Sequence, residues 1–114
     1  MGHKVLVVDD EDLALEVTAS MLEDLGCVVV TATCGGEALK TLSEDVSITI
    51  LLTDINMPGM TGYELAERAK RSRPRLQVLL LSGREPDGHG FPMIRKPFMQ
   101  DDLRRMMEHT TGLC

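Results

Sequence analysis

Short unbroken apolar runs and longer segments with helical spacing take turns along the chain. A continuous apolar run bounded by turn residues predicts a strand that is buried on both faces. Such runs cover residues 4–8, 47–53 and 76–81, and residues 27–32 and 92–95 predict two further strands. Apolar positions three and four residues apart predict amphipathic helices, and these segments cover residues 12–25, 37–43, 63–72 and 100–109.

Strand and helix therefore alternate, which predicts one α/β domain over residues 1–114. With right-handed crossovers, this alternation predicts a doubly wound parallel sheet of five strands with helices on both faces. Among the common orders of such sheets we expect the flavodoxin-like order 2-1-3-4-5. On the first helix, a four-residue spacing predicts the stripe that faces the core, formed by Leu13, Val17, Met21 and Leu25.

The connection between the fourth and fifth strands departs from this alternation. Residues 83–92 include three glycines and two prolines, which leave little that can be helical. A parallel crossover normally contains a helix. We expect a mobile loop here instead, with the helix absent or reduced to about one turn.

Charge and composition restrict the partners. The formal net charge of −6 argues against nucleic acid and anionic membrane as direct partners. No apolar stretch approaches the roughly 20 residues of a membrane span, and the first strand begins too early for a signal peptide. The three cysteines are odd in number and lack a metal-ligand spacing, so we expect reduced thiols in a cytoplasmic protein.

Polar side chains follow the apolar runs where the strands end. The first strand leads into Asp9 and Asp10, the third into Asp54, the fourth into Ser82 and the fifth into Lys96. The carboxyl ends of parallel strands meet at one rim, where open α/β sheets bind ligands. Three carboxylates at one rim repel each other unless a cation shares the site, and Mg²⁺ suits carboxylate oxygens. With a lysine and a hydroxyl, this set predicts a phosphoryl-transfer site in which a carboxylate is the nucleophile.

These residues carry a family resemblance. The matching stretches resemble the receiver domain of bacterial two-component response regulators, the chemotaxis-Y-like superfamily, and they are Val7–Glu11, Thr53–Pro58 with Gly62, Ser82–Gly83 and Lys96–Phe98. The resemblance implies Mg²⁺-dependent transfer of a phosphoryl group to Asp54 from a phosphohistidine on a sensor histidine kinase or phosphotransfer protein. It implies altered contacts with an unidentified downstream protein, and no enzyme activity beyond the domain's own phosphorylation and dephosphorylation.

The resemblance also implies a metal site. Asp10, Asp54 and the backbone carbonyl of Asn56 would bind Mg²⁺, and Asp9 would act mainly through water. The oligomeric state is not implied in the same way, and a homodimer is left open.

The resemblance also implies that Lys96 and Ser82 recognise the phosphoryl group. Lys96 would pair with the phosphoryl oxygens, Ser82 would donate a hydrogen bond to one of them, and the bond between Lys96 and Pro97 would be cis. Two departures bear on switching, because Met93 stands where the family usually has an aromatic residue and residues 83–92 are shortened. Similar shortening occurs in receivers of hybrid histidine kinases, so a piece of such a kinase is an alternative context.

Two other functions stay open. A haloacid-dehalogenase-like phosphatase also forms an aspartyl phosphate, but it needs a second acid two residues after the nucleophile, where this chain has Asn56. A receiver-like module that binds partners without phosphate would need neither the acids nor Lys96. Each motif alone also has a structural explanation, since Asp9 and Asp10 could cap a helix and Ser82 could begin an ordinary turn.

Overall fold

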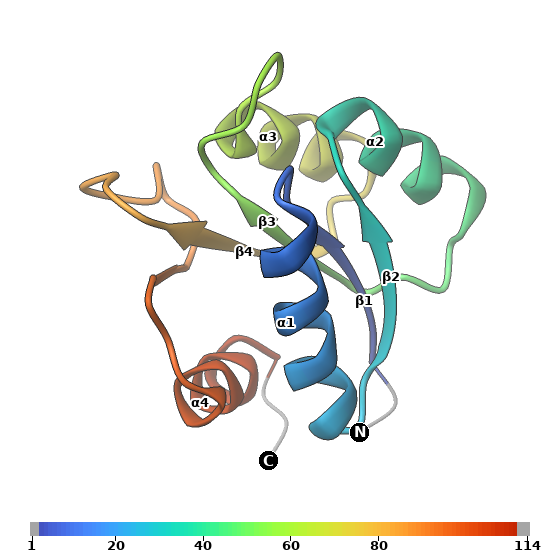
Figure 1. Ribbon diagram of the computed structural model, residues 1–114. Coiled ribbons are helices and arrows are strands. Elements are labelled where there is room, and N and C mark those ends of the chain that lie inside the picture. The colour runs from blue at the N-terminus through green and yellow to red at the C-terminus, as the bar shows by residue number, and fades with distance from the viewer. Residues whose placement is uncertain (1–2, 112–114) are drawn as a thin grey trace.

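The computed structural model describes residues 3–111, with side chains described for residues 3–108. Five strands and four helices form this part of the chain (Figure 1). In chain order they are β1 Lys4–Val8, α1 Asp12–Asp24, β2 Val28–Ala32, α2 Gly35–Glu44, β3 Ile50–Asp54, α3 Gly62–Ser72, β4 Gln77–Ser82, β5 Met93–Arg95 and α4 Gln100–Thr111.

The strands form one parallel sheet in the order β2-β1-β3-β4-β5. The predicted fold class and strand order are therefore confirmed. The third strand begins later than its apolar run, because it starts at Ile50 and includes Asp54 as its last residue. Asp54 thus lies at the carboxyl end of the central strand, where β3 is flanked by β1 and β4.

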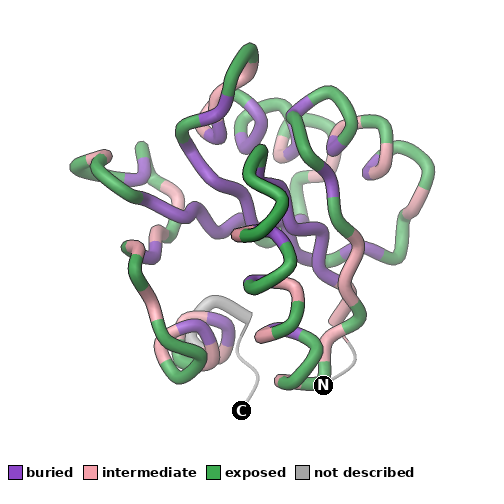
Figure 2. The backbone as a smooth tube through the Cα atoms, in the orientation of Figure 1, coloured by how far each residue is buried: buried purple, intermediate pink, exposed green. Residues whose placement is uncertain are grey.

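Two buried clusters lie on opposite faces of the sheet, because successive side chains of a strand point to opposite faces. Leu51 packs with buried residues of α2 and α3, whereas its neighbours Ile50 and Leu52 pack with buried residues of α1 and α4. Figure 1 shows these two pairs of helices on either side of the sheet, and Figure 2 shows the central strands buried along their length. All five residues of β3 are buried, which explains why Ile50, Leu51 and Leu52 are all apolar instead of alternating with polar residues.

The predicted inward stripe of the first helix is wrong for Leu13 and Val17, whereas Met21 and Leu25 pack, partly buried, against the cluster that contains Ile50 and Leu52. The side chains of Leu13 and Val17 are 73% and 47% exposed, and the buried residues of α1 are Leu15, Thr18 and Leu22. A strict four-residue spacing turns about 40° further around the helix at each step, so a run of four cannot stay on one face. The face that packs on the sheet instead follows steps of three and four residues, and it includes a threonine that the hydrophobic pattern passes over.

No helix forms in residues 83–92, as the glycines and prolines predict. The loop is nevertheless attached to its surroundings. The Tyr63 hydroxyl donates a 2.6 Å hydrogen bond to the Asp87 carbonyl, the Tyr63 ring stacks on His89 at 3.6 Å, and Arg95 donates to the Pro86 carbonyl. The mobility of this loop stays a prediction. Among the described helices, none is long and apolar enough to cross a membrane.

Candidate functional site

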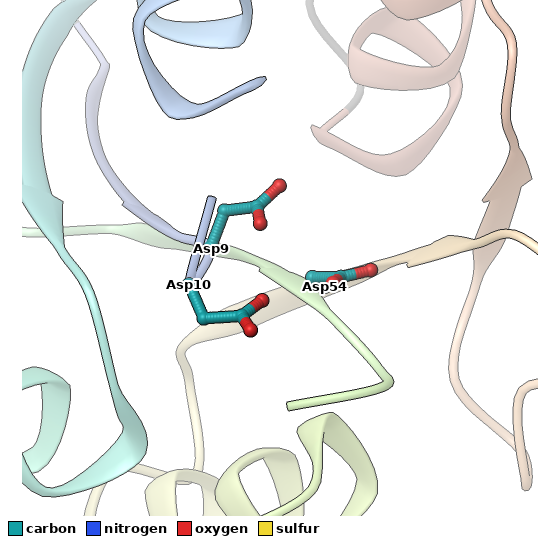
Figure 3. Close-up of side chains that lie close together, drawn as sticks. All are labelled: Asp9, Asp10 and Asp54. Carbon is teal, nitrogen blue, oxygen red and sulfur yellow. The ribbon is translucent and has the colours of Figure 1, made fainter. Parts of the chain in front are cut away.

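Three carboxylates meet at the carboxyl end of the sheet. Asp9 and Asp10 directly follow β1, and Asp54 ends the neighbouring strand β3. One oxygen from each of the three side chains lies within 4.8 Å of the others, and Figure 3 shows how the side chains gather at this edge. The strand order brings them together, because parallel neighbours end at the same rim.

Lys96 completes the cluster from the other side. Its ammonium lies 3.2 Å from Asp54 Oδ1 and donates a hydrogen bond to it, and lies 3.5 Å from Asp9 Oδ2. The backbone N–H of Lys96 donates to the Ser82 carbonyl at 2.7 Å, which fixes the segment after β5 against the end of β4. The peptide bond between Lys96 and Pro97 is cis, as the resemblance implies.

Burial governs the electrostatics of Asp54. Its side chain is almost completely enclosed, and this burial raises the pKa of the carboxyl, with Asp9 adding to the rise. The Lys96 ammonium opposes the rise but does not cancel it. For Lys96, burial favours the neutral amine, yet the carboxylates of Asp54 and Asp9 outweigh it and raise the pKa of the ammonium. The Lys96 ammonium is therefore stabilised by the two carboxylates that it contacts.

The donor set fits a divalent cation. Asp9 is 1% exposed, its Oδ1 accepts a hydrogen bond from the Glu11 N–H at 3.0 Å, and its Oδ2 has no hydrogen-bond partner among the described residues. A buried carboxylate oxygen without a donor is costly, and three carboxylates facing one ammonium leave excess negative charge. A hard cation with oxygen ligands would relieve both. The backbone carbonyl of Asn56 as a ligand stays a prediction.

Ser82 does not face the carboxylates through a hydrogen bond. Its buried hydroxyl lies 3.0 Å from the Glu85 carbonyl and 3.2 Å from Glu85 Oε1. Glu85 is not among the site residues that the sequence predicts. The sequence feature that could have identified this residue is its position three residues after the serine, in a turn that also contains Gly83. Met93, the other position noted in the sequence, is partly buried against the cluster under α2 and α3.

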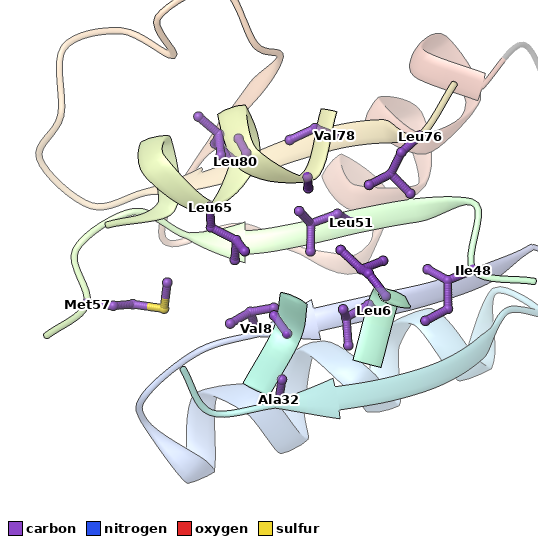
Figure 4. Close-up of a cluster of buried hydrophobic side chains, with 14 of the residues drawn as sticks. Leu6, Val8, Ala32, Ile48, Leu51, Met57, Leu65, Leu76, Val78 and Leu80 are labelled. Atoms are coloured by element: carbon purple, nitrogen blue, oxygen red, sulfur yellow. The ribbon is translucent and has the colours of Figure 1, made fainter. Parts of the chain in front are cut away.

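The turn after β3 is fixed by the start of α3. The Gly62 N–H donates to the Ile55 carbonyl at 2.8 Å, and a capping box joins Thr61 and Glu64 at the helix N-terminus. Leu65 then packs in the buried cluster beneath the turn (Figure 4). Because the glycine lies directly against the backbone of Asp54, α3 and the site share one rigid connection.

Replacing Asp54 with asparagine is expected to stabilise the protein at neutral pH without added metal. The raised pKa means that the folded state disfavours the ionised carboxyl, so stability falls as pH rises from the ordinary aspartate pKa through the folded value. Asparagine removes this cost, by on the order of 1 kcal/mol. Urea unfolding with a chelator at pH 7 and near pH 3.5 should show the gain only at pH 7.

The matched control for this substitution is Asp87→Asn, because the Asp87 side chain is 67% exposed and lies in the loop. It should change stability little at either pH. A less stable Asp54→Asn protein at pH 7 would contradict the electrostatic account of the site.

Comparison with known proteins places this geometry in context. A family model for the response regulator receiver domain matches residues 5–108. Response regulator SaeR of Staphylococcus epidermidis is 38% identical over 111 residues, which cover 90% of this chain and 47% of that protein. The chain thus spans about half the length of this relative.

Two solved structures are similar along nearly the whole chain. The receiver domain of the hybrid histidine kinase CckA has a TM-score of 0.83 and 30% identity, and the match covers 97% of this chain and 99% of that one. Response regulator TrrA from Thermotoga maritima, solved in complex with Mg²⁺ and BeF, has a TM-score of 0.86 and 26% identity, with coverage of 95% and 98%. Their folds agree with the doubly wound sheet described above.

Proposed function

The chain belongs to the response regulator receiver domain family, and on that premise we propose that Asp54 accepts a phosphoryl group from a phosphohistidine on a partner protein. Receiver domains of this family are signalling modules rather than typical enzymes. The observation that carries the proposal is the cluster at the rim, where an enclosed carboxylate lies 3.2 Å from an ammonium and close to two further carboxylates. An aspartate in this setting is held for attack rather than simply solvated.

In the proposed transfer, an Asp54 carboxylate oxygen forms a bond to phosphorus as the bond from phosphorus to the histidine nitrogen breaks. The imidazole leaves with the electron pair of that bond. Lys96 is placed to neutralise charge on the phosphoryl oxygens, because its ammonium already contacts the accepting carboxylate. Asp54 must be ionised to attack, and the Lys96 ammonium favours the ionised carboxylate.

Mg²⁺ is the proposed cofactor. Asp10, Asp54 and the Asn56 carbonyl would hold the ion, with Asp9 acting mainly through water. When bound, the ion would offset the charge that collects on the phosphoryl oxygens. Support comes from the three carboxylates within 4.8 Å and from the Mg²⁺–BeF complex of TrrA. A buried Asp9 oxygen that accepts no hydrogen bond from the described residues, and has a 3.5 Å ion pair with Lys96, adds to this support.

The upstream partner is proposed to be a sensor histidine kinase or a phosphotransfer protein. A piece of a hybrid histidine kinase is a second context, favoured by the likeness to the receiver of CckA. In either context the phosphorylated domain would act by changing its contacts with a downstream protein.

The test is the binding of beryllofluoride, which mimics a phosphoryl group on a carboxylate, in the presence of Mg²⁺. Wild type is expected to bind it with chemical-shift changes at the strand ends, and Asp54→Ala is expected to show none of these changes. Asp87→Ala removes a carboxylate from the exposed loop and should bind as wild type does. Equal behaviour of wild type and Asp54→Ala would refute the proposed function.

A further inference from the structure

The carboxylate of Glu85 is held by three hydrogen-bond donors at the end of β4. Its Oε1 accepts from the Ser82 hydroxyl at 3.2 Å, from the Gly83 N–H at 3.2 Å and from the Arg84 N–H at 3.3 Å. Three donors that converge on one oxygen form a small anion-binding concavity. Here the chain fills that concavity with its own side chain.

These donors lie at the rim that carries the acids. Leu81 pairs with Asp54 across β3 and β4, so Ser82 follows one residue beyond that pair. On its other side Ser82 pairs with Arg95, and its carbonyl accepts from the N–H of Lys96. The serine is therefore enclosed between the strand that ends in the acceptor and the strand that leads to the lysine.

We propose that Glu85 is an internal competitor for a phosphoryl group on Asp54, because its carboxylate occupies the Ser82 hydroxyl and the neighbouring Gly83 N–H at this rim. This inference rests on the proposed function, because it concerns the occupant of the same site. We call the hydrogen bonds between these donors and the Glu85 carboxylate the Glu85 latch. The single hydrogen of the Ser82 hydroxyl is shared between the Glu85 carbonyl at 3.0 Å and Glu85 Oε1 at 3.2 Å, so a phosphoryl group that received it would displace both acceptors.

The charge of Glu85 makes it a fitting occupant. Burial raises the pKa of its carboxyl, but hydrogen bonds from the backbone N–H groups of Glu85 and Arg84, and from Ser82, outweigh this and lower it. The group is therefore anionic at neutral pH and resembles a phosphoryl oxygen as an acceptor. A phosphorylated Asp54 would also repel it. Because Glu85 is only partly buried, it can leave for solvent without opening the core.

Release of the latch would reach the loop that replaces the usual crossover helix. Pro86, the next residue, accepts a hydrogen bond from Arg95 at 3.2 Å. Asp87 accepts from the Tyr63 hydroxyl, which ties the loop to α3. A change at Glu85 thus bears on contacts along residues 85–87, and these contacts do not involve Met93. The latch offers a switching route that does not require an aromatic residue at that position.

The test measures the apparent affinity for beryllofluoride with Mg²⁺ by ¹H–¹⁵N NMR titration. Glu85→Ala is expected to bind about tenfold more tightly than wild type, because the carboxylate no longer holds the Gly83 and Arg84 N–H groups or shares the Ser82 hydroxyl. Glu85→Gln keeps an acceptor but loses the charge, so an intermediate gain is expected. Affinity for Mg²⁺ alone should be the same in all proteins, because the three acids are unchanged.

Asp87→Ala is the matched control, since it removes one carboxylate from the same loop without touching Ser82. It should leave the beryllofluoride affinity at the wild-type value. A second readout is the amide signals of Gly83 and Arg84, which should shift in ligand-free Glu85→Ala.

The outcomes separate the two proposals. If wild type binds beryllofluoride and folded Glu85→Ala binds equally or more weakly, the latch is wrong and the proposed function stands. If wild type binds none, the proposed function fails and the latch falls with it. Tighter binding by both Glu85→Ala and Asp87→Ala would indicate a general charge effect and would also overturn the latch.

Discussion

Replacing Lys96 with methionine is expected to lower the affinity for beryllofluoride with Mg²⁺ by about a hundredfold or more. Removal of one preorganised hydrogen-bond donor from an anion-stabilising site has an effect of this size. Methionine keeps much of the apolar stem but removes the ammonium that lies 3.2 Å from Asp54 and 3.5 Å from Asp9. Titration followed by NMR measures the effect. The same variant should also be less stable without metal, because two enclosed carboxylates lose their cation.

Two controls test whether the effect depends on where the lysine lies and on the shape of the charged group. Lys40→Met makes the same change on the exposed side of α2 and should bind beryllofluoride as wild type does. Lys96→Arg keeps the charge but places a planar guanidinium in a partly buried site, so a partial loss is expected. Wild-type affinity in Lys96→Met would show that the lysine has no part in recognition.

Replacing Gly62 with alanine is expected to destabilise the protein by about 3 kcal/mol, at the upper end of the cost of overpacking. A Cβ at this position would meet the carbonyl oxygen of Asp54 and would lie 2.7 Å from the Cα of Ile55. Both are backbone atoms of the turn after β3, so neither can rotate away. Urea unfolding measures the loss, and Mg²⁺ affinity should fall with it because Asp54 must shift.

Gly36→Ala is the matched control for this glycine. A Cβ there would have no neighbour within 4 Å, and the residue lies in the first turn of α2. Alanine should therefore stabilise the protein by about 0.5–1 kcal/mol through helix propensity and a less flexible unfolded chain. Similar effects of the two substitutions would contradict the close contact between α3 and the turn after β3.

The fold could be predicted because burial on both faces leaves a simple trace in the sequence. Val5 and Leu6 enter different clusters, so every residue of such a strand must be apolar, and the run is unmistakable. The side of each helix that packs on the sheet is harder to predict. On α1 the apolar residues outnumber the positions that the sheet can cover, and the pattern selected Leu13, which is exposed, over Leu15, which is buried.

The chemical residues could also be listed from the sequence, because each follows an apolar run. The contacts that these residues make could not be predicted in the same way. The pattern gave Ser82 a place at the rim, yet its hydroxyl lies against Glu85 in this structure. No periodicity distinguishes Glu85 from a solvated acid, since its partners are two backbone N–H groups and a serine whose positions depend on the turn after β4.

The strands and helices, the class of fold, and the acids and the lysine that follow the strands can all be read from the amino-acid sequence. The reason is that the side chains an element buries recur with the period of a helix or a strand, and this period is visible in the order of apolar and polar residues. Only the tertiary structure decided that Lys96 contacts both Asp54 and Asp9, and that Glu85 fills the concavity beside them. Those contacts join residues from separate elements, and their distances are set by how the elements pack rather than by any one segment.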